Sequence, residues 1–184
     1  MSKRLILLCH APTLSMREGG FPAPDEAIDE GGLRKLAKVR LPSPLPATVL
    51  TSPMAAARQT AENLKIDAEV ESGLRDMDHG DWTGRSLADI HASDPDALSR
   101  WIADPGSGAP GGETMDTLIS RISPWLDDIP KDVLAITHPM VIRAAMGSAL
   151  GLPQQALFRI DIAPLSAVTL SFNRVWRLQS LAVL

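Results

Sequence analysis

The chain has 184 residues, of which 45% are hydrophobic and 22% charged, the proportions of an ordinary soluble globular protein. This length suits one domain spanning 1–184, and the net charge of -4 argues against nucleic acid or an anionic membrane as the main partner. The single cysteine excludes an internal disulfide framework. The apolar run near the N-terminus is cut off by His10, too early for a signal peptide or a membrane span, so we expect a cytoplasmic protein.

The first half of the chain alternates short apolar runs with helical patterns. Asp29 is the expected N-cap of one helix, and Ser52 with Pro53 is expected to begin another, as N-cap and first helical residue. Glycine and proline place loops between these segments. The expected strands cover 3–9, 48–51 and 68–71, the helices 30–39 and 52–64, and the loops 11–24 and 41–46.

The second half continues the same alternation. A loop rich in Asp, Gly and His is expected at 74–85, where it has the composition of a functional loop. The other expected elements are helices at 87–91, 95–103, 113–126 and 139–150, a strand at 133–137, and a hairpin of 167–171 with 174–178. Strands and helices that alternate and close with a hairpin predict an α/β fold, a three-layer α/β/α sandwich whose sheet is mostly parallel with an antiparallel edge.

Polar side chains follow three of the expected strands, at His10, at Ser52 and at His138. Because the carboxyl ends of parallel strands share one rim, these side chains are expected to lie together. Arg58 lies in the helix after the second strand, and the helix that starts at Pro139 points its positive end at His138. Two imidazoles, a guanidinium and a helix N-terminus indicate a phosphoryl site, with an anion-sized pocket between His10, Arg58 and His138.

Five segments, in order along nearly the whole chain, resemble the signatures of the histidine phosphatases, the phosphoglycerate-mutase-like superfamily. The first segment is similar to the Arg-His-Gly that ends the family's first strand, and the second to its Ser-Pro…Arg-Gln-Thr-Ala segment. The third is similar to the family's Leu-x-Glu-x-x-x-Gly-x-Trp-x-Gly loop, the fourth to its Gly-Gly-Glu-Ser, and the fifth to its second histidine segment. The segments are 8–13 (LCHAPT), 51–61 (TSPMAAARQTA), 74–84 (LRDMDHGDWTG), 111–114 (GGET) and 137–143 (THPMVIR).

The resemblance implies hydrolysis of a small phosphorylated metabolite through a phosphohistidine, without a metal or another cofactor. His10 would be the nucleophile, Asp76 the general acid in place of the family's usual Glu, and His138 a group that stabilises the transferring phosphoryl group. Arg58 would bind the phosphate oxygens through the parallel N–H donors of its planar guanidinium. The implied substrate-binding set is completed by four residues: Cys9, Thr13, Ser52 and Pro139.

One departure from the family pattern bears directly on activity. Cys9 stands where the motif has an arginine, and a thiol cannot replace a guanidinium that binds phosphate. Arg17, Arg34 and Arg143 are the residues that could compensate. Two hypotheses therefore stay open: a phosphomonoesterase impaired by Cys9, and a catalytically degenerate member that binds a phosphorylated ligand or acts in regulation. A mutase is disfavoured because the chain is short.

Three further residues receive an interpretation. His79 is expected at the rim of the site. Glu113 either caps the helix that it opens or faces the site, and we favour the cap. A metal site made of Cys9, His10, His79 and His138 lacks a recognised zinc spacing, so none is expected. The sequence leaves the oligomeric state and the substrate open.

Overall fold

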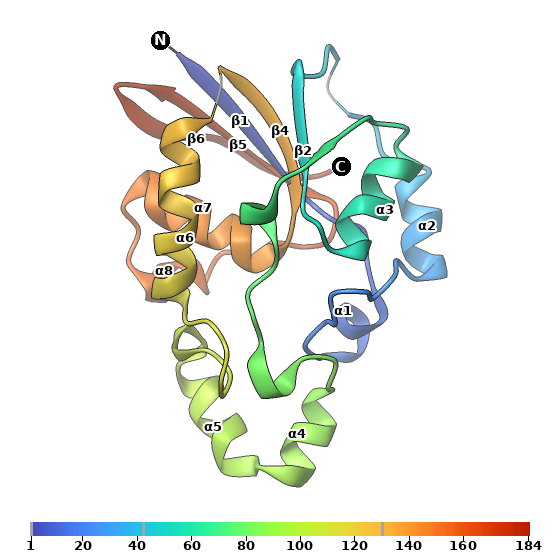
Figure 1. Cartoon of the computed structure of the whole chain (residues 1–184), viewed down its shortest axis with the longest axis vertical. Helices are drawn as coiled ribbons and strands as arrows, with labels where there is room; N and C mark the ends of the chain where they lie inside the picture. The colour runs from blue at the N-terminus through green and yellow to red at the C-terminus, as the bar shows by residue number, and fades with distance from the viewer. Residues whose placement is uncertain (1, 42, 130) are drawn as a thin grey trace.

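The computed structural model describes residues 2–41, 43–129 and 131–184, and its centre is a six-stranded sheet in the order β3-β2-β4-β1-β5-β6 (Figure 1). β1, β2, β3 and β4 run parallel to one another, whereas β5 and β6 are antiparallel and form one edge. The strands are β1 (Lys3–Cys9), β2 (Thr48–Thr51), β3 (Glu69–Val70), β4 (Asp132–Thr137), β5 (Ser166–Asn173) and β6 (Val175–Val183). The α/β sandwich with a mostly parallel sheet and an antiparallel edge is confirmed.

Helices cover both faces of the sheet, and β1 shows which residues point to which face. Leu5, Leu7 and Cys9 belong to the core on the side of α6 (Met115–Asp128) and α7 (Pro139–Leu150). Ile6 and Leu8 belong to the core on the side of α3 (Ala55–Asn63), and α2 (Glu30–Leu36) also lies on that side in Figure 1. Because successive side chains of a strand alternate between faces, Cys9 points into the layer of α6 and α7.

Local sequence explains where several helices begin and end. The Asp29 carboxylate accepts a hydrogen bond from Gly32 N, as expected for the N-cap of α2, and Pro139 occupies the first turn of α7. Gly151 ends α7 with a positive φ of 65°, which glycine adopts without a steric penalty. The remaining helices are α1 (Leu14–Glu18), α4 (Leu87–Ser93), α5 (Pro95–Ala103) and α8 (Gln154–Leu157).

Several predicted boundaries are wrong. α3 begins at Ala55 with Met54 as its N-cap, because the hydroxyl of Ser52 is used elsewhere, and α2 ends at Leu36 rather than at residue 39. The expected loop 11–24 contains α1, and α8 was not expected. The loop 74–85 is irregular as predicted, with 3-10 turns at Ser72–Leu74 and Gly80–Trp82.

A smaller lobe made of α4 and α5 projects from the end of the sheet where β1, β2 and β4 finish (Figure 1). Its core contains Phe21, Trp82 and Ile90, so the segment after α1 and the 74–85 loop are anchored in the lobe. Across the described residues, no helix is both long enough and apolar enough to cross a membrane.

Candidate active site

The structure brings together the side chains that follow β1, β2 and β4. Backbone hydrogen bonds from His10 N to Thr137 O and from Ser52 N to Ile136 O, each 2.9 Å, continue the sheet to this rim. The rings of His10 and His138 meet edge to face with their centroids 4.9 Å apart. His138 Nε2 lies 2.8 Å from Ser52 Oγ. The prediction that the three strand ends share one rim is confirmed.

The surroundings of His10 leave one ring nitrogen free. Its Nδ1 lies 2.8 Å from the carbonyl oxygen of Ala11, and because a carbonyl can only accept, Nδ1 carries the proton. The other nitrogen, Nε2, therefore holds the lone pair. Burial, reinforced by the neighbouring His138, lowers the pKa of His10 to about 4. The imidazole is neutral at pH 7 and can act as a nucleophile at Nε2.

Asp76 lies beside His138 in the same buried region. Its Oδ2 is 3.5 Å from His138 Nδ1, a nitrogen with no hydrogen-bond partner within the described residues, and its Oδ1 accepts from Met77 N at 2.8 Å. Burial raises the pKa of Asp76, although nearby His79 and His10 oppose the shift. Burial lowers the pKa of His138 to about 3. A carboxyl that keeps its proton to higher pH beside a neutral histidine is suited to proton transfer.

Arg58 is not brought to the histidines. It is exposed on α3, whereas Ala56, two residues earlier, lines a small pocket with His10 and His138. Residues two apart on a helix lie about 200° apart, so Arg58 points to the solvent side. The pocket between the histidines holds about 10 Å³, roughly one water, and Arg58 does not line it.

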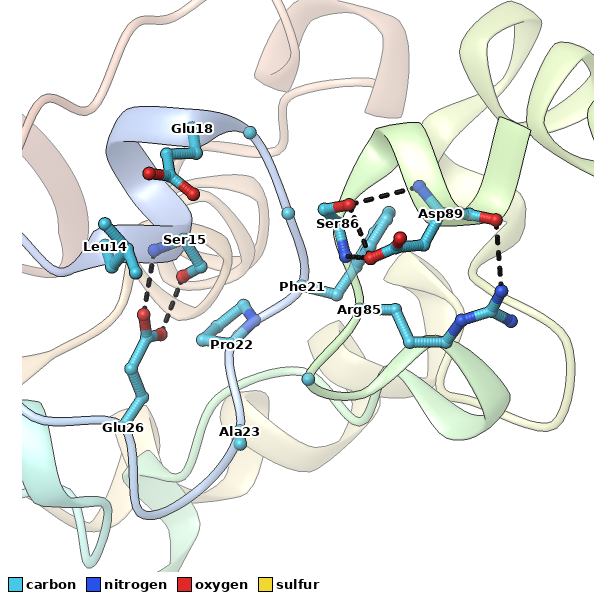
Figure 2. Close-up of a pocket in the computed structure, with 13 residues that line it drawn as sticks. Leu14, Ser15, Glu18, Phe21, Pro22, Ala23, Glu26, Arg85, Ser86 and Asp89 are labelled. Carbon is cyan, nitrogen blue, oxygen red and sulfur yellow. Dashed lines mark hydrogen bonds between the residues drawn. The ribbon is translucent and has the colours of Figure 1, made fainter. Parts of the chain in front are cut away.

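A carboxylate also lines that small pocket. Glu26 accepts hydrogen bonds from Ser15 N at 2.8 Å and Ser15 Oγ at 2.6 Å, which fix it against α1 (Figure 2). The segment that carries it folds back through a bridge between Thr13 and Ile28. Nothing in the local sequence connects Glu26 with His10, because their proximity depends on this fold-back.

The larger cavity beside His10 lies towards α7 and the lobe. It has a volume of about 310 Å³, and its polar lining includes His10, Asp76, His79 and Arg143, with Pro139 at the start of α7. His79 thus lies at the edge of the site, as expected.

Of the three arginines proposed to compensate for Cys9, only Arg143 lines the cavity beside His10. Arg17 forms an ion pair with Asp29, and Arg34 is 73% exposed beside Glu30. Sequence spacing does not show which of the three arginines reaches the cavity, because that depends on which face of the sheet each helix covers.

Cys9, Thr13 and Ser52 are all buried near the rim but differ in what they contact. Cys9 is fully buried, and burial raises the pKa of its thiol, so it carries no charge against phosphate. Thr13 lines the small pocket, with its Oγ1 3.2 Å from Ser15 Oγ. Ser52 Oγ faces His138 and accepts from Met54 N, which is why Ser52 does not cap α3 as expected.

The cap expected from Glu113 is wrong. Thr114 is the N-cap of α6, and its side chain accepts from Thr117 N. Glu113 instead accepts from Asp78 N at 3.0 Å and pairs with Arg121, a residue that the sequence did not single out. No group of three or more His, Cys, Asp and Glu side chains that could hold a metal occurs in the described part of the chain.

The comparisons with known proteins agree with this geometry. The family model of the histidine phosphatase superfamily (branch 1) matches residues 5–182. The bifunctional protein Rv2228c of Mycobacterium tuberculosis is 31% identical over 131 residues, 65% of this chain and 36% of that protein. Phosphoserine phosphatase 1 of Hydrogenobacter thermophilus is 28% identical over 115 residues, 59% of this chain and 52% of that protein. The chain thus matches only about a third to a half of the length of these curated relatives.

Solved structures extend the similarity over nearly the whole chain. The mycobacterial glucosyl-3-phosphoglycerate phosphatase Rv2419c in complex with VO3 superposes with a TM-score of 0.82 at 26% identity, covering 96% of this chain and 97% of that one. The alpha-ribazole phosphatase of Shigella flexneri superposes with a TM-score of 0.83 at 19% identity, covering 97% and 95%.

The structure is an α/β protein in which two histidines are paired at one rim of a mostly parallel sheet. The chain belongs to the histidine phosphatase superfamily (branch 1), as the match over residues 5–182 shows.

Proposed function

We propose that this protein hydrolyses small phosphomonoesters through a phosphohistidine at His10, with Asp76 as the general acid. The observation that carries the proposal is the hydrogen bond from His10 Nδ1 to Ala11 O, which leaves Nε2 unprotonated in a buried ring. The phosphatases among the similar proteins support the reaction class. A cytoplasmic location, tested by cell fractionation, is part of the same proposal.

The reaction divides into two steps that balance. In the first, the lone pair of His10 Nε2 attacks phosphorus, the bond from phosphorus to the ester oxygen breaks, and the leaving oxygen takes the proton of Asp76. In the second, the Asp76 carboxylate takes a proton from water as the water oxygen attacks the phosphohistidine. The N–P bond breaks, inorganic phosphate leaves, and neutral His10 is restored.

Two features support a slow reaction. Cys9 supplies no positive charge at the position where the family motif has arginine, and hydrogen bonds to charged groups contribute about 1.5–3 kcal/mol each. The Glu26 carboxylate lines the pocket between His10 and His138 and disfavours an anion there. About 1.4 kcal/mol lowers a rate tenfold, so each hydrogen bond lost with the arginine slows the reaction by about ten- to a hundredfold unless another guanidinium replaces it.

The same two features favour a second candidate function, in which the protein binds a phosphorylated ligand without turnover. Cys9 and Glu26 weaken transition-state stabilisation, yet leave the 310 Å³ cavity beside His10 open to a ligand. Phosphate binding without release of p-nitrophenol from p-nitrophenyl phosphate would establish this second function.

The test of catalysis compares the unchanged protein with His10→Ala and with His91→Ala, a matched change at an exposed histidine of α4. We expect release of p-nitrophenol from p-nitrophenyl phosphate to be lost in His10→Ala and retained in His91→Ala. Equal turnover in His10→Ala and the unchanged protein would refute the proposed reaction.

A further inference from the structure

Arg143 is half-buried and lines the cavity beside His10, where burial lowers the pKa of its guanidinium and the charge of Asp161 opposes that shift. Its Nε and Nη2 donate to the carbonyl oxygen of Ile160 at 3.3 and 3.1 Å, and Nη1 lies 3.7 Å from Met140 Sδ. Within the described residues, no carboxylate oxygen lies within 4.0 Å of it. Charged groups removed from water are normally paired, so a guanidinium in this setting is suited to an anion that enters the cavity.

Side chains of β1 alternate between the two faces of the sheet, and this alternation explains why Arg143 lies near Cys9. Cys9 points into the layer of α7, and Arg143 is carried by α7. The two side chains are close enough for the charge of Arg143 to oppose the effects of burial and of Asp76 on the Cys9 thiol pKa. A guanidinium from α7 therefore occupies the neighbourhood that a long cationic side chain at Cys9 would reach. Arg58, on α3, belongs to the opposite layer.

Beyond the polar side chains of His10, Ser15, Asp76, His79 and Arg143, the side chains that line this cavity are apolar. Met16, Met140, Phe21 and Trp101 line it, and the rings of Phe21 and Trp101 meet edge to face with centroids 5.2 Å apart. Arg143 is the only arginine or lysine among the described lining residues. The volume of about 310 Å³ is at the lower end of the range of about 300–1,000 Å³ found for small-molecule sites. The lining suits one phosphate and one compact apolar group, and offers no second cation for a carboxylate or another phosphate.

We propose that Arg143 binds the phosphate of the substrate beside His10, and that the site selects phosphomonoesters whose organic part is apolar and carries no second anionic group. The selection of substrates rests on the proposed function. Phosphate binding by Arg143 does not, because it can be measured without turnover.

The first experiment is titration of the protein with inorganic phosphate by calorimetry, in the unchanged chain and in Arg143→Gln, Arg143→Lys and Arg58→Gln. We expect Arg143→Gln to weaken binding at least about tenfold, because a charge-assisted hydrogen bond is lost. Arg143→Lys should retain part of the affinity, and Arg58→Gln should bind as the unchanged chain does. Equal affinity in Arg143→Gln, or a loss confined to Arg58→Gln, would overturn the proposal.

A second measurement uses only the unchanged protein, in case Arg143→Gln fails to fold. Phenylglyoxal modifies accessible guanidiniums, and mass spectrometry locates the modified residues. We expect inorganic phosphate to protect Arg143 and to leave Arg58 as reactive as before. Modification of Arg143 that phosphate does not slow would count against its role.

The substrate preference is tested with 1-naphthyl phosphate and 3-phosphoglycerate, which differ in apolar area and in the presence of a carboxylate. We expect kcat/KM to be at least about tenfold higher for 1-naphthyl phosphate, and Trp101→Ala to reduce this ratio, because it removes an aromatic contact with the naphthyl ring. A preference for 3-phosphoglycerate would refute the apolar substrate class. Phosphate binding through Arg143 without hydrolysis of either ester would instead refute the proposed function and leave the anion site standing.

Discussion

Arg121 holds Glu113 through two hydrogen bonds, from Nε to Oε1 and from Nη2 to Oε2, each 2.9 Å long. The same guanidinium donates to the carbonyl oxygens of Gly73 at 2.6 Å and Asp76 at 3.2 Å. Burial acts against ionisation of Glu113, but its hydrogen bonds from Arg121 and Asp78 N lower its pKa overall. Arg121 thereby ties α6 to the loop that carries Asp76, and fixes the position of the proposed general acid.

Replacing Arg121 should therefore lower the stability of the fold. Arg121→Gln leaves Glu113 without its bidentate partner, and we expect a loss of at least about 2 kcal/mol in the free energy of unfolding. Urea denaturation measures this loss. Arg75→Gln is the matched control, because Arg75 Nη2 lies 3.4 Å from Glu113 Oε1, a longer contact, and 48% of the Arg75 side chain is exposed. We expect this change to cost less than about 1 kcal/mol in the free energy of unfolding. Equal losses in the two variants would contradict the stabilising role of the Arg121–Glu113 pair.

The pH dependence of kcat/KM should have two limbs of known origin. Turnover needs neutral His10, so the rate should fall below about pH 4, the pKa to which burial lowers this imidazole. It also needs protonated Asp76, so the rate should fall as pH rises through the raised pKa of that carboxyl. In Asp76→Asn, we expect kcat/KM to be lower by about a hundredfold or more. We also expect the decrease of kcat/KM at high pH to disappear, because asparagine does not titrate. An unchanged alkaline limb in Asp76→Asn would assign that limb to another group.

Acid should destabilise the fold through its buried histidines. The pKa of His138 is about 3 in the folded state, below the ordinary value of 6.5, so between these limits the unfolded chain binds more protons. Stability therefore falls as pH decreases through this window, by up to about 1.4 kcal/mol per pH unit for one histidine. Asp76 acts in the opposite direction, because its raised pKa adds stability at low pH.

The contribution of His138 is isolated by comparing unfolding of the unchanged protein and His138→Gln in urea from pH 6.5 to 4.5. We expect a shallower decrease of stability in the variant, since glutamine does not titrate. Parallel curves for the two proteins would show that His138 is not buried in its neutral form.

Cys9→Arg should not restore an efficient phosphatase. Cys9 is fully buried in the layer of α7, where Arg143 already places a guanidinium. We expect Cys9→Arg to lower the free energy of unfolding by more than about 2 kcal/mol, through overpacking and burial of a second positive charge. Cys9→Leu, which adds bulk without charge, separates these two effects. A stable Cys9→Arg protein with raised kcat/KM would show that Arg143 does not serve in its place.

The sequence predicted the parts of the fold that depend on local pattern. The apolar runs at β1, β2 and β4 and the histidines that follow two of them were sufficient to place His10 and His138 at one rim, and the structure confirms this. Motif spacing places Arg58 in the site, but α3 starts two residues later than predicted and its helical periodicity turns Arg58 to solvent. Glu26 and Arg121 reach the site through contacts distant in sequence, which no local pattern contains.

The most direct measurement of the central claim is trapping of the phosphoenzyme. The protein is mixed with p-nitrophenyl phosphate, quenched with base within milliseconds to seconds, and digested for mass spectrometry. We expect one phosphate on His10, stable to base and lost in acid, and absent from His10→Ala. Turnover without a phosphohistidine, or a phosphate carried by any residue other than His10, would contradict the account.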